Sequence, residues 1–205
     1  MIPNGSPKRI LYLAPTLPFP PSTGGQRRSF NFLNYLSSQG NVTLVSPGDS
    51  SYDREALIEL KPYCKDVVLV NSKDFGPHSK NGKRMSIFER IKKTIKKEPW
   101  VLRDFISEEF KSTLFCLGLE SFDFIFVRYP MLAYYFFTEK RFAPFLSRIV
   151  VDVDDVLVKM QERRAQSMAS GYAKWRHGLE VSFLKQFYRV IIGKNWDNDY
   201  CIYKN

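Results

Sequence analysis

The stretch RILYLAPTLPFPPSTGGQRRSFNFLNYLSSQGNVTLV, residues 9–45, decides the fold. It opens with an apolar run at residues 9–14, which is typical of a parallel strand buried on both faces. A loop rich in proline and glycine, residues 15–25, leads to a helical pattern over residues 26–39 that ends at Gly40. A second strand, VTLVS, follows. The order strand, helix, strand predicts a parallel pair joined by a right-handed crossover.

The same alternation continues along the rest of the chain. After the first run, strands are predicted at residues 42–46, 66–70, 123–127, 148–153 and 189–193. Helical patterns lie between them, at residues 53–60, 86–97, 107–117, 131–138 and 157–187. The last is predicted as one long helix or two shorter ones, with Gly171 and Gly178 as places where it could break. The pattern predicts an α/β fold with a Rossmann-like, doubly wound, mostly parallel sheet and helices on both faces. In such a sheet ligands bind beyond the carboxyl ends of the strands, so the segments that follow strands carry the candidate site.

Length and composition favour one globular domain. The chain has 205 residues, of which 44% are hydrophobic and 25% charged, and this argues against wholesale disorder. Residues 1–8 are predicted to be a flexible lead and residues 9–205 a single Rossmann-like domain. The most apolar stretch, residues 122–137, is interrupted by Asp123, Arg128 and Pro130, so it is not predicted to span a membrane.

Cysteine usage and the N-terminus indicate a cytoplasmic protein. The three cysteines are far apart, odd in number and not in metal-ligand spacing. A reducing compartment is the simplest interpretation. The first residues, MIPNGSPKRI, lack the apolar segment of a secretory signal.

The chain is strongly basic, and most of its charge is local. The formal net charge is +10, which indicates an anionic partner such as a nucleic acid, an acidic membrane face or a phosphorylated ligand. Residues 80–97 carry eight basic residues and one acidic residue. No nucleic-acid motif accompanies this charge, so a nucleic acid is not predicted as the partner.

The basic segment has the pattern of an amphipathic helix. Residues 86–97 place their apolar side chains on one helical face, and Trp100 follows. The membrane-facing residues predicted on the other side are Lys92, Lys93, Lys96, Lys97 and, beyond the helix, Trp100. One interpretation is a helix lying on an anionic membrane surface, where each Lys or Arg contributes about 1 kcal/mol. The other is an ordinary helix whose apolar face packs on the sheet.

The loop after the first strand is the first candidate binding element. Gly24 and Gly25 allow the backbone to approach a ligand, and the helix that follows offers amides and a positive dipole end to a phosphate. The alternative is a tight turn that needs glycine at positive φ. Arg27 and Arg28 begin the helix and either pair with a phosphate or are simply solvated.

Acidic and basic residues follow two later strands. Asp152, Asp154 and Asp155 close the strand RIVVDV, and one of them is a candidate base that accepts a proton from an acceptor hydroxyl, with Asp154 favoured. Their alternative role is to cap or brace the next helix. Arg128 and Tyr129 end the strand DFIFV at the same edge. There Arg128 either meets an anionic ligand or pairs with the aspartates.

Taken in order, these segments resemble the N-terminal domain of family-4 glycosyltransferases of the GT-B fold. Residues 9–45 resemble the opening of that domain, with its proline-rich loop ending in Gly-Gly. RIVVDVDDV, a long helix with Glu180 and then YRVII resemble its later part, and the Asp-Val-Asp-Asp string resembles a bacterial subgroup linked to exopolysaccharide synthesis. The resemblance covers roughly residues 8–200. Single motifs are weak, and their order and spacing carry the specificity.

The resemblance implies one half of a two-domain enzyme. The half present would bind a saccharide or lipid-linked acceptor, and a C-terminal domain absent from this chain would bind the nucleotide-sugar donor. Gly24, Gly25 and Arg27 would face the donor diphosphate, Arg128, Tyr129 and Asp152 would line the cleft, and Asp154 and Asp155 would be catalytic. No cofactor or metal is expected, since GT-B enzymes generally do not need one. The protein would be cytoplasmic and peripheral at the inner face of the plasma membrane. A non-catalytic Rossmann-like module that binds a phosphorylated ligand or is recruited to a membrane is the alternative.

Overall fold

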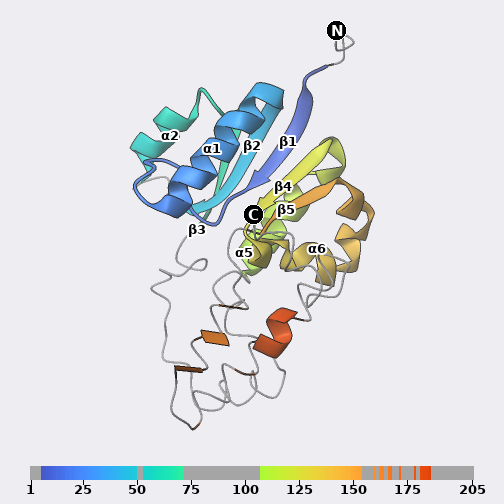
Figure 1. Cartoon of the computed structure of the whole chain (residues 1–205). Coiled ribbons are helices and arrows are strands. Elements are labelled where there is room, and N and C mark those ends of the chain that lie inside the picture. Colours follow the sequence, from blue (N-terminus) through green and yellow to red (C-terminus); the bar gives the residue numbers. More distant parts are fainter. Residues whose placement is uncertain are drawn as a thin grey trace. The chain divides into compact units, whose positions relative to one another are not determined.

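The computed structural model describes residues 6–49, 53–71 and 107–153, and, beyond them, residues 159, 162, 163, 166, 167, 171, 178 and 181–185 (Figure 1). The chain divides into two compact units. One comprises Met1–Lys83 and Asp104–Val153, and the other Arg84–Arg103 and Asp154–Asn205. Each is described by itself. The single domain predicted over residues 9–205 stays a prediction, and the predicted helix 86–97 and strand 189–193 lie outside the described residues.

The first unit is built on a five-stranded sheet in which every strand runs parallel to its neighbours. The strand order is β3-β2-β1-β4-β5. The strands are β1 (Lys8–Leu13), β2 (Gly40–Gly48), β3 (Asp66–Asn71), β4 (Phe124–Arg128) and β5 (Ile149–Asp152). Five of the six predicted strands are therefore present, each within two residues of its predicted bounds. The predicted α/β, Rossmann-like, doubly wound class is confirmed.

The central strand shows why the sequence pattern selects this sheet. Ile10 and Tyr12 belong to the core on the face covered by α1 (Gly24–Gln39) and α2 (Arg54–Leu60). Leu11 and Leu13 point to the opposite face, because side chains alternate along a strand, and both are fully buried. A strand buried on both faces has no solvent-facing position for polar residues, which accounts for the uninterrupted apolar run.

The helices lie on both faces because the chain winds outward from β1 in two directions. β1 to β2 and β4 to β5 step in opposite directions across the sheet. Right-handed crossovers therefore place α1 and the β4–β5 connection on opposite faces, as can be followed in Figure 1. The point between β1 and β4, where the strand order reverses, is where doubly wound sheets open a crevice at their carboxyl edge.

The segment between β3 and β4 contains α5 (Glu108–Cys116) and the short 3₁₀ helix η1 (Leu119–Ser121). α5 agrees with the predicted helix over residues 107–117. Phe110 and Leu114 are its buried residues. Gly118, at φ 63°, lies between α5 and η1 and has the left-handed conformation that favours glycine.

The connection from β4 to β5 differs from the prediction. A single helix over residues 131–138 is predicted, whereas the structure has the 3₁₀ helix η2 (Pro130–Ala133), the short α6 (Tyr134–Thr138) and a second 3₁₀ segment, η3 (Lys140–Arg148). Pro144 lies inside η3 and has no backbone N–H to donate. The segment is stabilised by burial of Phe142, whose ring packs in a tilted arrangement against Phe136, with 5.1 Å between the ring centroids. Tertiary packing here overrides a weak helical pattern.

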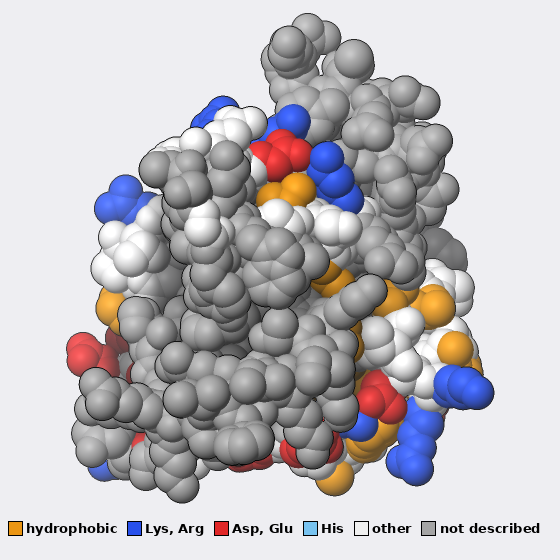
Figure 2. Space-filling model, turned by 90° about the horizontal axis from the view of Figure 1, so that it is seen from below, with side chains coloured by type: hydrophobic (Ala, Val, Ile, Leu, Met, Phe, Trp, Pro, Cys, Tyr) orange, Lys and Arg blue, Asp and Glu red, His pale blue; other side chains and the backbone are white. Residues whose placement is uncertain are grey.

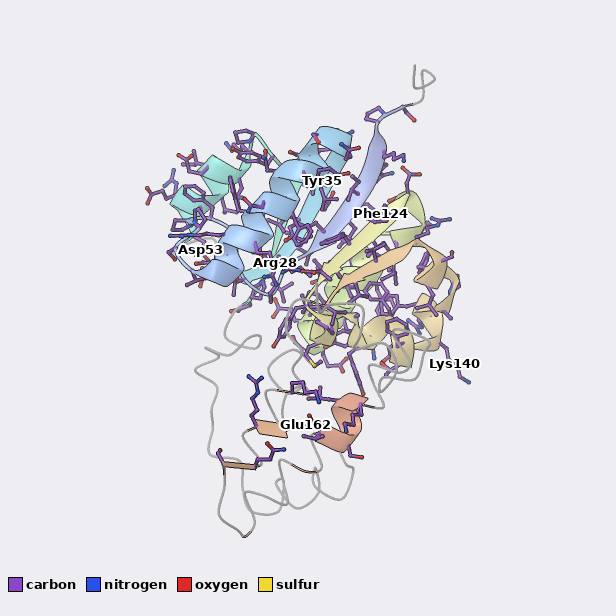
Figure 3. The ribbon with its side chains drawn as sticks, in the orientation of Figure 1. Arg28, Tyr35, Asp53, Phe124, Lys140 and Glu162 are labelled. Carbon is purple, nitrogen blue, oxygen red and sulfur yellow. The ribbon has the colours of Figure 1, made fainter. Side chains whose placement is uncertain are left out.

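In the second unit, the predicted helix over residues 157–187 is interrupted. Gly171 has φ 93°, a conformation that an α-helix cannot contain, so this position breaks the helix as its glycine suggested. Lys159 and Lys185 each pair with one oxygen of Glu162, at 3.2 and 3.1 Å. Burial opposes ionisation of Glu162, but the hydrogen bonds from the two lysines prevail and lower its pKa. Glu162, labelled in Figure 3, therefore forms an ion pair with a residue on the other side of Gly171, Lys185.

Candidate functional site

The candidate site is built where the carboxyl ends of β4 and β5 meet the first turn of α1. β1 and β4 are neighbours, and so are β4 and β5, with Arg128 paired in register with Asp152. The loop after β1 carries the chain to α1, whose N-terminus lies at the same edge. Arg28, labelled in Figure 3, lies near this end of α1, and Tyr35 lies toward the other.

The first turn of α1 is fixed by a capping box. Thr23 is the N-cap, and its Oγ1 accepts a hydrogen bond from the Gln26 backbone N–H at 3.2 Å. The Gln26 side chain in turn accepts from the Thr23 N–H at 3.2 Å. Such reciprocal bonds satisfy two amides that a helix start otherwise leaves without partners. Gln26 also donates to the Leu17 carbonyl oxygen at 3.4 Å, which joins the proline-rich loop to the helix.

Gly24 and Gly25 are the first two residues of α1, not part of the loop before it. The predicted helix starts at residue 26, whereas the observed one starts at Gly24. Among the described glycines only Gly118 and Gly171 have positive φ, so a turn that needs Gly24 or Gly25 at positive φ is excluded. Both glycines are exposed, and a Cβ at Gly24 would meet nothing within 4 Å. Within the described residues, no acceptor takes a hydrogen bond from either amide.

The carbonyl of Gly25 anchors this turn to the sheet. Arg128 Nη2 donates to it at 3.2 Å, and Ser29 Oγ donates to it at 3.0 Å. Tyr12, fully buried on β1, donates its hydroxyl to the Ser29 carbonyl oxygen at 3.0 Å. Burial raises the pKa of Tyr12 well above its usual range, so this hydroxyl stays protonated and remains a donor. Side chains from β1 and β4 therefore hold the start of α1 in place.

Asp152 lies between two arginines. Arg28 Nη2 contacts Asp152 Oδ1 at 2.7 Å, and Arg128 Nε lies 4.0 Å from Asp152 Oδ2. The Asp152 and Arg128 side chains are almost completely buried, whereas that of Arg28 is 43% exposed. The ion pair between Arg128 and the aspartates that the sequence offered as an alternative is thus present for Asp152. Arg28, which the sequence left between phosphate binding and solvation, pairs with a carboxylate instead.

Tyr129 has the unusual backbone of this edge. Its φ is 89°, and it is the one described residue other than glycine with positive φ. The cost of such a conformation is of order 1–3 kcal/mol. The neighbouring Arg128 and Pro130 are both buried, and the Tyr129 N–H donates to the Asp152 carbonyl oxygen at 3.3 Å. Tyr129 itself is half-buried, so the strained corner lies at the surface of the candidate site.

Positive charge is concentrated around the first turn of α1. No acidic residue occurs in that turn. Arg27 is exposed, with its Nε bound to the Pro21 carbonyl oxygen at 3.1 Å. Arg28 and Arg128 both pair with Asp152, and the exposed Arg27 adds a further positive charge close to the positive end of the helix dipole. The described part of the face seen in Figure 2 carries Lys and Arg side chains as well as Asp and Glu side chains.

The remaining predicted site residues lie outside the described residues. They are Asp154, Asp155, Lys92, Lys93, Lys96, Lys97 and Trp100. In the part of the chain that the structure describes, no group of three or more His, Cys, Asp or Glu side chains is placed to hold a metal ion. The described helices also include none that is long and apolar enough to cross a membrane.

The structure brings together Gly25, Arg28, Arg128 and Asp152, which the sequence had indicated as candidates, and adds Tyr12 and Ser29. The sequence pattern placed Tyr12 in an apolar strand and Ser29 in a helix, and singled out neither of them. A hydroxyl inside an apolar strand is the one sequence signal that marks Tyr12, because a buried phenol needs a hydrogen-bond partner. The identity of that partner depends on the packing of α1.

Comparison with protein-family models, with characterised proteins and with solved structures finds no match to this chain.

Proposed function

We propose that this chain is the acceptor-side domain of a GT-B glycosyltransferase of the family-4 type, and that the first turn of α1 faces the diphosphate of a nucleotide-sugar. The observation that carries the proposal is the cationic start of α1 at the switch point of a doubly wound sheet. Helix starts usually carry acidic residues, which stabilise the dipole. A start with arginines and exposed amides instead suits an anionic ligand.

The resemblance of residues 9–45 supports a sugar-nucleotide over other anions. In this proposal the amides of Gly24 and Gly25 face the diphosphate, and Arg27 adds charge from the exposed side of the turn. Tyr129 and Asp152 line the cleft. Asp154, or Asp155, accepts the proton of the acceptor hydroxyl as the hydroxyl oxygen bonds to the anomeric carbon. The bond from that carbon to the diphosphate breaks, and the nucleoside diphosphate leaves with the electron pair.

A second domain is needed to hold the donor nucleotide. The acceptor is a saccharide or a lipid-linked saccharide, and Lys92, Lys93, Lys96, Lys97 and Trp100 bring the cytoplasmic protein to the inner face of the plasma membrane. The 205-residue chain alone is then expected to transfer no sugar. Transfer or hydrolysis of a sugar nucleotide by this chain alone would contradict the proposal that it is half of an enzyme.

A titration with uridine diphosphate and inorganic pyrophosphate, followed by amide NMR, tests the site. The amide signals of Gly24 and Gly25 should shift on titration, and a neutral monosaccharide should leave them in place. Arg27→Glu should weaken the binding at least fivefold. Lys140→Glu makes the same change in net charge at an exposed position on η3 and serves as the control (Figure 3). Equal weakening by both variants, or no shift at millimolar ligand, would exclude this site.

The alternative function is a non-catalytic module that binds a phosphorylated ligand or is recruited to a membrane. The same anion-binding site favours it, so the titration does not distinguish the two functions. The reading frame after Asn205 does. A second Rossmann-like domain with a pair of glutamates supports the enzyme, and a stop codon supports the module.

Membrane recruitment is tested separately by sedimentation with anionic vesicles. Reversal of Lys92, Lys93, Lys96 and Lys97 to Glu should abolish co-sedimentation. If the native chain and the fourfold variant sediment equally, membrane contact through this segment is excluded.

A further inference from the structure

We propose that Arg128 is a positioning residue, which fixes the first turn of α1 against the end of β4 and so places the Gly24 and Gly25 amides for an anion. The anion part of this inference rests on the proposed function. The sequence suggested that Arg128 meets an anionic ligand directly or pairs with the aspartates. Its geometry instead gives it a role that acts through the backbone of α1.

Burial and direction both point away from direct contact with a ligand. Arg128 is only 3% exposed, whereas Arg28 on α1 keeps 43% of its side chain in solvent. The Arg128 Nη2 is bonded to the Gly25 carbonyl oxygen at 3.2 Å. Arg128 therefore acts on the site indirectly, through its hydrogen bond to the Gly25 carbonyl oxygen. Gly25 is exposed, and its N–H belongs to the proposed anion site.

The positive charge of Arg128 makes this arrangement energetically costly. A cation beside the N-terminus of a helix opposes the dipole, and a buried cation requires a counter-ion. The Asp152 carboxylate lies 4.0 Å from Arg128 Nε, and it also pairs with Arg28. A neutral side chain could bond the same carbonyl without this cost. The guanidinium adds positive potential below the turn while its bond keeps the turn in place.

Small displacements of such a turn have large effects on binding and catalysis. Misplacing a reacting or binding group by about 1 Å costs roughly a hundredfold in rate. Gly25 has no side chain that could anchor it, and a Cβ at this position would lie 4.0 Å from Arg128 Nη2, in ordinary contact. The bond from Arg128 to the backbone is therefore a direct restraint on Gly25, and Ser29 Oγ supplies a second one from within the helix.

The test compares three variants of Arg128 that separate charge from hydrogen bonding. Arg128→Met removes both, Arg128→Gln keeps a donor without charge, and Arg128→Lys keeps the charge with a shorter reach. Arg148→Met is the matched control. Arg148 Nη1 also binds backbone carbonyls, those of Glu120 and Phe122 at 3.3 and 3.0 Å, but at the start of β5, the opposite end from Asp152.

Two readouts are taken on the full 205-residue chain. The first is amide hydrogen exchange over residues 27–30 without ligand. Arg128→Met should accelerate exchange there at least tenfold relative to β1, and Arg148→Met should leave it unchanged. The second is the dissociation constant for inorganic pyrophosphate. Arg128→Met should raise it at least tenfold, and Arg128→Gln should restore a part of the lost affinity although it is neutral too.

The outcomes distinguish positioning from charge. If Arg128→Gln and Arg128→Met weaken pyrophosphate binding equally while Arg128→Lys binds normally, the charge alone matters and the positioning role is overturned. Unchanged exchange over residues 27–30 in folded Arg128→Met also overturns it. If Arg128→Met does not fold, Arg128→Gln and Arg128→Lys give the same comparison. If the unaltered chain binds no pyrophosphate, the proposed function fails, and the exchange readout still decides the role of Arg128.

Discussion

α1 and α5 start with the same local device and opposite charge. Thr23 caps α1 and Ser107 caps α5, and each hydroxyl oxygen accepts from the N–H three residues on, at 3.2 and 3.3 Å. α5 then places two glutamates in its first turn, whereas α1 has none there. Ser107 is buried, and the first turn of α1 is largely exposed. The difference shows that glutamates in α5 balance the positive end of its helix dipole, whereas α1 leaves its positive end open to solvent.

A buried tyrosine holds each of the two helix starts. The Tyr12 hydroxyl donates to the Ser29 carbonyl oxygen, at 3.0 Å. The Tyr135 hydroxyl donates to the Ser107 carbonyl oxygen at 3.0 Å and also accepts from the Ser107 N–H. Both turns are therefore anchored from inside the protein. What distinguishes them is the charge presented outside, and the comparison is best tested by changes that separate anchor from charge.

The largest difference is expected at the carboxylates. Asp152→Ala removes a nearly buried carboxylate that pairs with the buried Arg128 and should lower the free energy of unfolding by about 3 kcal/mol. Glu109→Ala at α5 removes an exposed acceptor of the Asn71 N–H and should cost less than about 1 kcal/mol. Urea unfolding of both variants measures the two values. Similar losses would mean that Asp152 is no more important than a surface acid.

The anchoring tyrosines should differ by a smaller amount. Tyr135→Phe leaves the buried Ser107 N–H without its partner, and we expect a loss of about 2 kcal/mol. Tyr12→Phe removes one donor from a helical carbonyl, and a loss of about 1 kcal/mol is expected. Both substitutions keep the ring in place, so urea unfolding reports the hydroxyl alone. A greater loss for Tyr12→Phe would show that α1 depends on its anchor more than α5 does.

Alkaline pH should lower the stability of the folded protein. Burial raises the pKa of Tyr12 and of Tyr135 above the ordinary value of 10.0. Above pH 10 the unfolded chain therefore loses these protons while the folded chain keeps them, so stability falls as pH rises. Burial also raises the pKa of Cys64 from 9.0 to about 12, which starts the decline near pH 9. Urea midpoints at pH 8 and 10.5 should fall less in the Tyr12→Phe and Tyr135→Phe variants.

Charge reversals in the first turns should have the smallest effects, of opposite sign. Arg27→Glu places a favourable charge at the start of α1 and should stabilise the protein by about 0.5 kcal/mol. Glu108→Arg at α5 should destabilise it by about the same amount. Thermal unfolding at low salt measures both, and added salt should shrink both. If Arg27→Glu is destabilising, positive charge at the start of α1 does not carry the electrostatic cost that the helix dipole predicts.

The prediction for α5 succeeded because its signals are local. Ser107, Glu108 and Glu109 are consecutive residues that together mark a helix start. Phe110 and Leu114 supply the apolar face. The same holds for β1 and β2, where apolar runs specify parallel strands. The connection after β4 was predicted less well. There Pro144 and the buried Phe142 impose a long 3₁₀ segment that no periodicity indicates.

By itself the sequence determined the five described strands, the helices α1, α2 and α5, the parallel sheet and the edge at which a site would form, because these depend on local periodicity and on the handedness of crossovers. It also placed Gly25, Arg128 and Asp152 at that edge. Only the tertiary structure decided that Arg128 turns inward to the Gly25 carbonyl and that Asp152 pairs with both Arg28 and Arg128. The physical reason is that a guanidinium selects among all acceptors within its reach, and only the packing of α1 on β1 and β4 determines which acceptors those are.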